Sequence, residues 1–319
     1  MMGNKALPVV WQENELDARM LAYRQASMSE ATKRVIIKVW TAFDMWCRFQ
    51  RLASFPCNPA VLARYLVALA DRGLKPASIG QAVYGIGARH RLAGVPSPSS
   101  APEVRATLGG IRRTFSTSQR RAAALTIEHV RKLRAPCAMT ERRDRALLMV
   151  AVASGLRSAE LVALTLGDVD SISDGYRLLV RRSKGDQEGK GATVEVVAAQ
   201  QDGDGCPARV LGVWMAELRS LGHSGASASL FPAIHLNRAA VPGPMSVQMV
   251  RAIVRKAAVR LGLDPSLYSG HSTRAGCATY LLDKGVPLNV VADHLRHSDI
   301  NITRRYDRNR TSRALKGVY

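Results

Sequence analysis

Apolar residues recur at helical spacing through the first third of the chain and predict four helices there. The first extends from residue 29 to about residue 50, because one face of this stretch is apolar and the other is basic. Its apolar positions are Val35, Ile36, Val39, Trp40, Phe43, Trp46 and Cys47. Residues 1–28 carry no strong periodic pattern, and we expect a partly ordered arm there.

Turn and capping residues mark the next helices. Asn58 is a capping residue with Pro59 in the first turn, and Gly73 ends this second helix. The third covers about residues 76–92, and the fourth covers residues 102–113. Glycines within the third helix lower its intrinsic helix propensity, so we expect it to depend on tertiary packing or on a closely approaching partner.

The pattern changes after a polar, basic stretch at residues 116–124, which we interpret as an interdomain linker. Helices are predicted to begin at Thr126 and Thr140, the second of them ending at Gly155. Strand-like runs at residues 176–182 and 193–198 flank a Gly-rich segment, and a basic amphipathic helix is predicted for residues 246–261. The expected fold class is therefore mainly α with a small β-sheet (α+β), in a helical N-terminal domain and a mixed second domain.

The charge of the chain points to a polyanionic partner. Of its 319 residues, 46 are Lys or Arg and 25 are Asp or Glu, which gives a formal net charge of +21. Both halves are basic, with 17 Lys or Arg against 7 Asp or Glu in residues 1–120 and 29 against 18 in residues 121–319. Nucleic acid is the natural partner, because each neutralised phosphate releases counterions. An aromatic content of 5% gives little support to an RNA-binding module that stacks bases.

Other functional classes are disfavoured by what the sequence lacks. No apolar run approaches the length of a membrane-spanning helix and no signal peptide opens the chain, so we expect no membrane partner and a cytoplasmic, nucleoid-associated protein. We also expect no metal and no cofactor, because neither ligand spacing nor a phosphate-binding glycine loop is present. His294 and His297 lie three residues apart, but no carboxylate or thiol is placed convincingly beside them. The five cysteines show no C-x-x-C pairing and are expected to stay reduced: Cys47, Cys57, Cys137, Cys206 and Cys277.

Seven residues spread over 150 positions carry the candidate chemistry. They are Arg157, Glu160, Lys184, His271, Arg274, His297 and Tyr306. Taken alone, Arg157 and Glu160 would be read as an ordinary helix-surface ion pair. Taken together, the seven supply the nucleophile, the cations and the proton donors and acceptors that cleavage of a phosphodiester requires. Arginine suits the phosphate in particular, because its planar fork grips two oxygens and keeps its charge.

The order of these residues resembles the active site of the tyrosine recombinases. The matching segments are Gly-Leu-Arg-Ser-Ala-Glu, a Lys between two strand-like runs, His-Ser-Thr-Arg, and a His nine residues before a Tyr. The likeness covers about residues 29–310 and is closest to the Cre-like branch. It rests there on Ser-Glu-Ala-Thr in the first helix, Tyr-Leu-Val-Ala-Leu-Ala-Asp-Arg-Gly-Leu in the second, and Ser-Gly-His-Ser-Thr-Arg-Ala-Gly-Cys-Ala at residues 269–278.

The resemblance implies a role for each residue. Tyr306 would be the nucleophile that forms a covalent phosphotyrosine, with Arg157 and Arg274 as the clamp on the phosphate. Glu160 would orient the site rather than react.

The proton-transfer roles follow from the same resemblance. Lys184 would protonate the departing 5′-oxygen, His271 would act as acid and base near the tyrosine hydroxyl, and His297 would donate to the phosphate. Lys190, at the other end of the predicted hairpin, is the rival of Lys184. The segment Arg-Ser-Lys directly after the first strand favours Lys184, as in the family.

Two departures from the family pattern stand out. The Cre-like branch carries Trp where His297 stands, whereas the wider family usually has His. The wider family also favours Gly before that His, and here Arg296 precedes it. A Cβ and a charge at position 296 can reshape the turn or add a phosphate contact, and neither departure removes a catalytic group.

The resemblance further implies a C-shaped clamp on DNA. The chain would comprise an N-terminal arm at residues 1–28, a helical core DNA-binding domain at 29–115, a linker at 116–124, a catalytic domain at 125–306, and a tail at 307–319 that docks on a neighbouring subunit. Side chains expected to touch DNA are Arg34, Val35 and Lys38 of the first helix, Ser78 and Gln81 of the third, Arg120 and Arg121 of the linker, and Gln248 and Arg251 of the basic helix.

These expectations describe a site-specific DNA recombinase that acts as a homotetramer on two double-stranded DNA sites, through a Holliday junction and without metal or ATP. Two alternatives remain open. One is a non-catalytic architectural or regulatory DNA-binding protein with the same fold. The other is an enzyme like a type IB topoisomerase, which relaxes supercoils by similar tyrosine chemistry and does not depend on a specific paired site.

Overall fold

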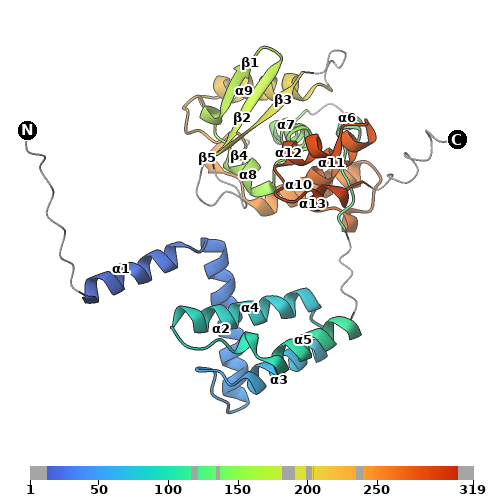
Figure 1. Ribbon diagram of the computed structural model, residues 1–319. Helices are drawn as coiled ribbons and strands as arrows, with labels where there is room; N and C mark the ends of the chain where they lie inside the picture. Colours follow the sequence, from blue (N-terminus) through green and yellow to red (C-terminus); the bar gives the residue numbers. More distant parts are fainter. Residues whose placement is uncertain are drawn as a thin grey trace, which may run out of the picture. The chain divides into compact units, whose positions relative to one another are not determined.

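The computed structural model describes residues 13–115, 121–133, 137–181, 191–198, 203, 205–234 and 240–307. The chain forms two compact units, Met1–Gln119 and Arg120–Tyr319 (Figure 1).

All described secondary-structure elements of the N-terminal unit are helices. Its elements are α1 (Glu13–Ala26), α2 (Glu30–Phe49), α3 (Pro59–Asp71), α4 (Pro76–Leu92), the short 3₁₀ helix η1 (Pro98–Ser100) and α5 (Pro102–Thr114). Ser29 caps α2 by accepting a hydrogen bond from the Thr32 backbone N–H, and Asn58 caps α3 in the same way through Ala60. The four helices predicted for this region are therefore confirmed, with boundaries within one or two residues.

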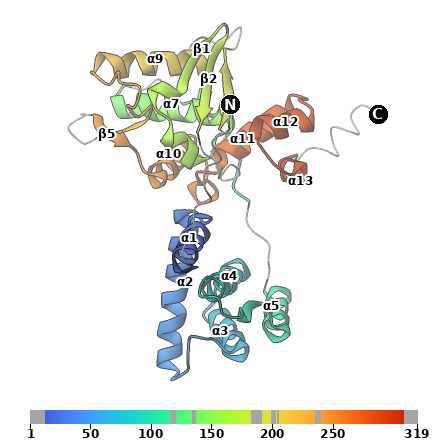
Figure 2. The same ribbon diagram turned by 60° about the vertical axis from the view of Figure 1, so that its left-hand side comes forward.

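The core of this unit lies where α2 packs on α4 and α3 packs on α5 (Figure 2). Phe43, Leu66 and Ile86 are fully buried there. A Cβ added to Gly85 of α4 would lie 2.8 Å from a methyl carbon of Val39 on α2. This close approach confirms that α4 depends on tertiary packing, because the glycine permits a helix contact that any larger residue would obstruct.

Helix α1 occupies residues for which the sequence predicts a partly ordered arm. Its apolar side chains Leu16, Met20 and Tyr23 are 46%, 50% and 69% exposed. Since these side chains are not buried against the rest of the unit, no core-facing pattern marked the helix in the sequence.

The C-terminal unit combines helices with two small sheets. Its helices are α6 (Ile127–Arg131), α7 (Met139–Ser154), α8 (Ser158–Ala163), α9 (Pro207–Ser220), α10 (Val247–Arg260), α11 (Ser272–Asp283), α12 (Leu288–Leu295) and α13 (Ile300–Arg304), with 3₁₀ turns η2 (Leu166–Asp168) and η3 (Pro265–Leu267). Its strands are β1 (Val169–Ile172), β2 (Gly175–Val180), β3 (Ala192–Val197), β4 (Pro232–Ile234) and β5 (Ala240–Pro244).

Strands β1, β2 and β3 form an antiparallel sheet in that order. Leu178 of β2 pairs with Val194 of β3, and both are buried, whereas the neighbouring pair Arg177 and Glu195 forms an exposed ion pair of 2.8 Å. This alternation places one face of the sheet on the core, where α7 and α9 pack against it. The hairpin of β4 and β5 was not predicted, because its strands are short and contain three prolines.

The predicted boundaries in this unit rest on local signals. Thr126 is the residue before α6, and Ser246 caps α10 by accepting from the Met249 backbone N–H. Gly155 ends α7 in the left-handed conformation, with φ of 61°. The mainly helical fold with a small sheet is therefore as the sequence predicts. None of the described helices is long and apolar enough to cross a membrane.

Candidate active site

The site begins at the junction of α7 and α8. Gly155 turns the chain, and Arg157 directly precedes α8. The Arg157 backbone N–H donates to Oε2 of Glu160 at 2.9 Å, and its Nη1 donates to Oε1 at 2.6 Å. The Glu160 side chain is 3% exposed and that of Arg157 is 28% exposed. Glu160 thus holds both the backbone and the side chain of Arg157 from the buried side, while the guanidinium keeps contact with solvent.

Arg274, on α11, is 1% exposed and joins three elements. Its Nη1 donates to the carbonyl oxygen of Gly155 at 2.6 Å, and its Nη2 donates to the carbonyl oxygen of Leu295 at the end of α12. A guanidinium has five N–H donors, so these bonds orient the group without exhausting it.

Tyr306 follows α13 and meets His271, which directly precedes α11. Nε2 of His271 lies 2.7 Å from the phenolic oxygen of Tyr306. The tyrosine ring also packs on a small apolar cluster that includes Cys277, Leu282 and Leu295. The hydroxyl is therefore placed by two independent contacts, a hydrogen bond to the imidazole and burial of the ring.

The pKa shifts of His271 and Tyr306 set the protonation states in which the phenolic proton can pass to the histidine. Partial burial, and next the charges of Arg274 and Arg157, lower the pKa of His271. Burial raises the pKa of Tyr306, partly offset by the charges of Arg274 and Arg157. At neutral pH the imidazole is therefore neutral and the phenol protonated, which is the state a general base and its nucleophile require.

His297 lies on the other side of the tyrosine. Its ring is stacked on that of Tyr306, with centroids 6.1 Å apart and an interplanar angle of 9°. Nδ1 of His297 is 2.8 Å from Oγ1 of Thr303, which is fully buried. Burial, followed by the charges of Arg274 and Arg157, lowers the pKa of His297 to about 4. In the neutral tautomer whose Nδ1 accepts from Thr303, Nε2 carries the proton and can donate it to a ligand.

The site carries a net positive charge, because three arginines surround the single carboxylate of Glu160. Burial raises the pKa of Glu160, but hydrogen bonds from Arg157 and the charges of Arg296 and Arg157 outweigh it and lower that pKa below its ordinary value. Burial, and next the charges of Arg157 and Arg296, lower the pKa of Arg274 to about 10, so it remains charged at neutral pH. Three arginines and one glutamate leave two net positive charges, which suits a phosphate diester and its transition state.

Six of the seven predicted residues therefore come together. Lys184, its rival Lys190 and Arg120 lie outside the described residues. Lys184 belongs to the connection between β2 and β3, three residues beyond Arg181, whose Nε contacts Oδ1 of Asp168 at 2.5 Å.

Sequence reasoning missed two residues of the site. Thr303 gave no signal, because its contact with His297 depends on the turn into α13. Arg296 stands out in the sequence as a departure from the family's usual Gly, but nothing in the sequence indicates that its partner is Glu160. Its Nη2 donates to Oε2 of Glu160 at 2.7 Å.

The residues expected to read DNA are not part of this cluster. On the N-terminal unit, Arg34, Lys38, Ser78 and Gln81 are exposed and Val35 is half-buried; on the C-terminal unit, Gln248 and Arg251 of α10 are exposed. Arg121 is exposed too, and its Nη1 donates to the carbonyl oxygen of Arg305 at 3.2 Å, one residue before the tyrosine.

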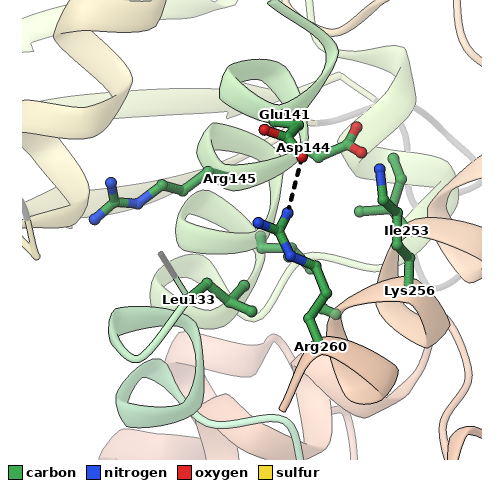
Figure 3. A pocket seen from close by; sticks show the side chains of 9 residues that line it. Leu133, Glu141, Asp144, Arg145, Ile253, Lys256 and Arg260 are labelled. Atoms are coloured by element: carbon green, nitrogen blue, oxygen red, sulfur yellow. Dashed lines mark hydrogen bonds and ion pairs between the residues drawn. The ribbon is translucent and has the colours of Figure 1, made fainter. Parts of the chain in front are cut away.

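A small hollow of about 30 Å³ lies elsewhere in the C-terminal unit, between α7 and α10 (Figure 3). An ion pair of 3.2 Å between Arg260 and Glu141 spans it, and Asp144 and Lys256 also line it. It contains none of the seven predicted residues, and its lining includes two carboxylates and three cations. Across the described ranges, no three His, Cys, Asp or Glu side chains gather as a possible metal site.

Known proteins are similar to this chain in sequence and in fold. The "Integrase/recombinase xerD homolog" of Selenomonas ruminantium is 28% identical over 303 residues, which cover 92% of this chain and 86% of that protein. "Recombinase cre" of Escherichia phage P1 is also 28% identical, over 328 residues that cover 95% and 92% of the two chains.

Among solved structures, a lambda integrase (75–356) dimer bound to a COC′ core site superposes with a TM-score of 0.59 at 20% identity, covering 92% of this chain and 95% of that one. XerH recombinase bound to a palindromic difH substrate gives a TM-score of 0.57 at 21% identity, covering 81% and 72%. These two likenesses concern the fold. Residues 124–313, which include all seven predicted residues, match the phage integrase family. The chain therefore belongs to the phage integrase family.

Proposed function

We propose that this protein is a site-specific DNA recombinase that cleaves and rejoins strands through a covalent bond between Tyr306 and a 3′-phosphate. The observation that carries the proposal is the contact of 2.7 Å between Tyr306 and a neutral His271, in a site that also holds Arg157 and Arg274. Among the described residues, Glu160 is the only carboxylate that forms an ion pair with either arginine. Relatives named as integrases and recombinases match nearly the whole chain, which supports the same activity here.

We infer the cleavage step from the roles assigned to these groups and, for Lys184, from the resemblance to the tyrosine recombinases. The phenolic oxygen of Tyr306 attacks phosphorus while its proton passes to Nε2 of His271, and the bond from phosphorus to the 5′-oxygen breaks. Lys184 gives its proton to that oxygen. A 5′-hydroxyl, from the same strand or a partner strand, then attacks the phosphotyrosine and reverses each step, so the bond energy is kept and no ATP is required.

The remaining groups stabilise the charge on the phosphate. Arg157 and Arg274 donate to its non-bridging oxygens, and His297 adds a donor through Nε2. Glu160 takes no part in bond making and orients Arg157. Because both histidines have lowered pKa values, they enter the reaction neutral, and each arginine keeps its charge.

We infer the assembly from the same chemistry. Exchange between two DNA sites requires four cleavages. Because each chain has one nucleophilic tyrosine, four chains are needed, which implies a homotetramer. The resemblance to the tyrosine recombinases implies that the DNA passes through a Holliday junction. The helical core DNA-binding domain at residues 29–115, the catalytic domain at 125–306 and the linker between them would grip one duplex. Their DNA contacts would be the exposed residues named above, with Arg120 of the linker. The tail from residue 307 would dock on a neighbouring subunit. The site of action would be the nucleoid in the cytoplasm.

A strand-exchange assay tests this function. Two duplexes that carry DNA flanking the gene, one of them labelled, are incubated with the protein, and hybrid-length products are measured. Tyr306→Phe removes the nucleophile, and Tyr280→Phe is the matched control, because Tyr280 is another partly buried phenol of the same unit and contacts Lys284 instead of the site.

Each outcome identifies one function. Hybrid products from the wild type and Tyr280→Phe, absent with Tyr306→Phe, support the recombinase. Relaxation of a supercoiled plasmid that lacks the flanking DNA, with no hybrids, would indicate topoisomerase-like activity. Binding without either product would indicate a non-catalytic DNA-binding protein.

A further inference from the structure

Arg296 adopts a backbone conformation that its own residue type disfavours. It caps the end of α12 with φ of 56° and ψ of 48°, and its N–H donates to the carbonyl oxygens of Ala292 and Asp293. The left-handed region costs a residue with a Cβ about 1–2 kcal/mol. Glycine commonly occupies this position at helix ends, so the backbone alone gives no reason for an arginine here.

The side chain of Arg296 is largely buried, and only part of its guanidinium is hydrogen-bonded. It is 14% exposed, and its Nη2 donates to Oε2 of Glu160 at 2.7 Å. Its Nε and Nη1 are buried and have no hydrogen-bond partner among the described residues. Buried donors of a charged group that lack an acceptor are unfavourable. The left-handed backbone and the two unpaired donors therefore oppose stability at this position, and the ion pair with Glu160 offsets them, which directs attention to what that ion pair does in the site.

Glu160 is the only side chain to which Arg296 donates in the described part of the chain, and it is the same carboxylate that holds Arg157. Oε1 of Glu160 accepts from Nη1 of Arg157, and Oε2 accepts from the Arg157 backbone N–H as well as from Arg296. With both oxygens engaged from two directions, the carboxylate plane cannot rotate without breaking a bond. Without Arg296, the only donor to Oε2 of Glu160 would be the neutral backbone N–H of Arg157. The carboxylate could then move together with the partly exposed side chain of Arg157.

The turn that carries Arg296 also serves the other half of the site. The residue before it, Leu295, accepts from Arg274, and the residue after it, His297, stacks on Tyr306. From this turn Arg296 donates to Glu160 of α8, and it thereby connects the group beside the nucleophile to the phosphate-binding Arg157.

We propose that Arg296 is a positioning residue that, through Glu160, fixes the guanidinium of Arg157 for binding the scissile phosphate. This inference rests on the proposed function, since Arg157 is assigned to the phosphate there. It predicts that Arg296 contributes to the rate of strand cleavage rather than to folding or to overall DNA affinity.

Arg296→Gly separates these effects, because glycine relieves the backbone and deletes the guanidinium. We expect a thermal stability equal to or above that of the wild type, a DNA dissociation constant within about twofold, and single-turnover cleavage slowed by about 10- to 100-fold at saturating protein. Arg296→Lys keeps a cation that can donate to Glu160, and we expect it to restore part of the rate.

Arg51→Gly is the matched control. Arg51 is the other described residue with a side chain at positive φ, 57°, and it is exposed in the N-terminal unit, outside the proposed machinery. Its replacement also relieves a left-handed backbone and removes one positive charge. We expect cleavage at the wild-type rate from DNA-saturated protein.

A double-mutant cycle with Glu160→Gln tests whether Arg296 affects the cleavage rate through Glu160. If Arg296 acts through Glu160, Arg296→Gly adds no further loss in the Glu160→Gln background. Independent, additive losses, or an Arg296→Gly protein that cleaves at the wild-type rate, would overturn the inference while leaving the proposed function intact. A wild-type protein that binds the same duplexes but cleaves none of them overturns both.

Discussion

Gly276 allows α11, the helix that carries Arg274, to lie directly against the chain that leads into the C-terminal unit. A Cβ built on Gly276 would lie 1.8 Å from the carbonyl oxygen of Leu125 and 2.9 Å from the backbone nitrogen of Thr126. Both contacts are with backbone, so no side-chain rotation relieves them. Gly276→Ala must therefore push the two segments apart.

The loss in free energy of unfolding follows from the contacts that this displacement breaks. Restoring an ordinary contact of about 3.4 Å requires a movement of about 1.6 Å. The hydrogen bond of 2.9 Å from the Leu125 N–H to the Ser272 carbonyl would then be lost, at a cost of about 1 kcal/mol. Leu125 is fully buried, and overpacking of the core adds about 1–3 kcal/mol. Alanine returns about 1 kcal/mol of helix propensity, so we expect a net loss of about 1–3 kcal/mol.

Gly110→Ala is the matched control. Gly110 also lies within a helix, α5, but a Cβ there meets nothing within 4 Å. The same chemical change should therefore raise stability by about 0.5–1 kcal/mol.

Calorimetry of the full chain measures both variants. We expect the transition of the C-terminal unit to fall by about 2–12 °C with Gly276→Ala, and no fall with Gly110→Ala. Cleavage should drop with the first variant alone, because α11 carries Arg274 and directly follows His271. A Gly276→Ala protein as stable as the wild type would refute the steric reasoning.

Further predictions concern the pH dependence and the other side chains of the site. His297 has a pKa of about 4 in the folded chain against 6.5 when unfolded, so its contribution to stability is present above pH 6.5 and is lost as the pH falls from 6.5 to 4. With allowance for solvent at the half-buried ring, the loss is about 1–2 kcal/mol, and His297→Gln should reduce the dependence in thermal melts at pH 4–8. Thr303→Val removes the partner of Nδ1 at nearly constant volume, and we expect slower cleavage with a stability loss of about 1 kcal/mol in urea titrations; an unchanged rate would remove Thr303 from the site. Arg274→Lys keeps the charge but cannot satisfy two carbonyl oxygens at once, so we expect loss of cleavage together with a lower melting temperature; cleavage at the wild-type rate would contradict the bidentate role.

The sequence predicts best those features that depend on neighbouring residues. Asn58 with Pro59, and Ser246 before α10, act within a few positions, and each marks a helix start that the structure has. Gly155 ends α7 for an equally local reason. The strand pair β2 and β3 was visible because alternate residues such as Leu178 and Val180 are apolar, and the antiparallel partner follows directly.

Features that depend on distant contacts were less visible. Glu160 and Arg157 were both expected in the site, but Arg296 joins them from 136 residues away, through a left-handed turn that no local pattern announces. Thr303 reaches His297 because α13 folds back on α12. Helix α1 escaped prediction because its described side chains are exposed, so its sequence need not alternate apolar and polar residues to face a core.

The central claim is that Tyr306 is the nucleophile. It is tested most directly by incubating the protein with nicked duplexes of the gene's flanking DNA in the presence of a chelator. A nick beside the scissile bond lets the released fragment diffuse away, which traps any covalent intermediate for detection in denaturing gels. Mass spectrometry of the digested product identifies the attached residue.

We predict a denaturant-resistant adduct with the wild-type protein, a nucleotide on the peptide that contains Tyr306, and no adduct with Tyr306→Phe. An adduct that persists with Tyr306→Phe, or that maps to another residue, would contradict the assignment of the nucleophile. Tight, salt-sensitive binding to the same duplexes with no adduct at all would contradict catalysis itself.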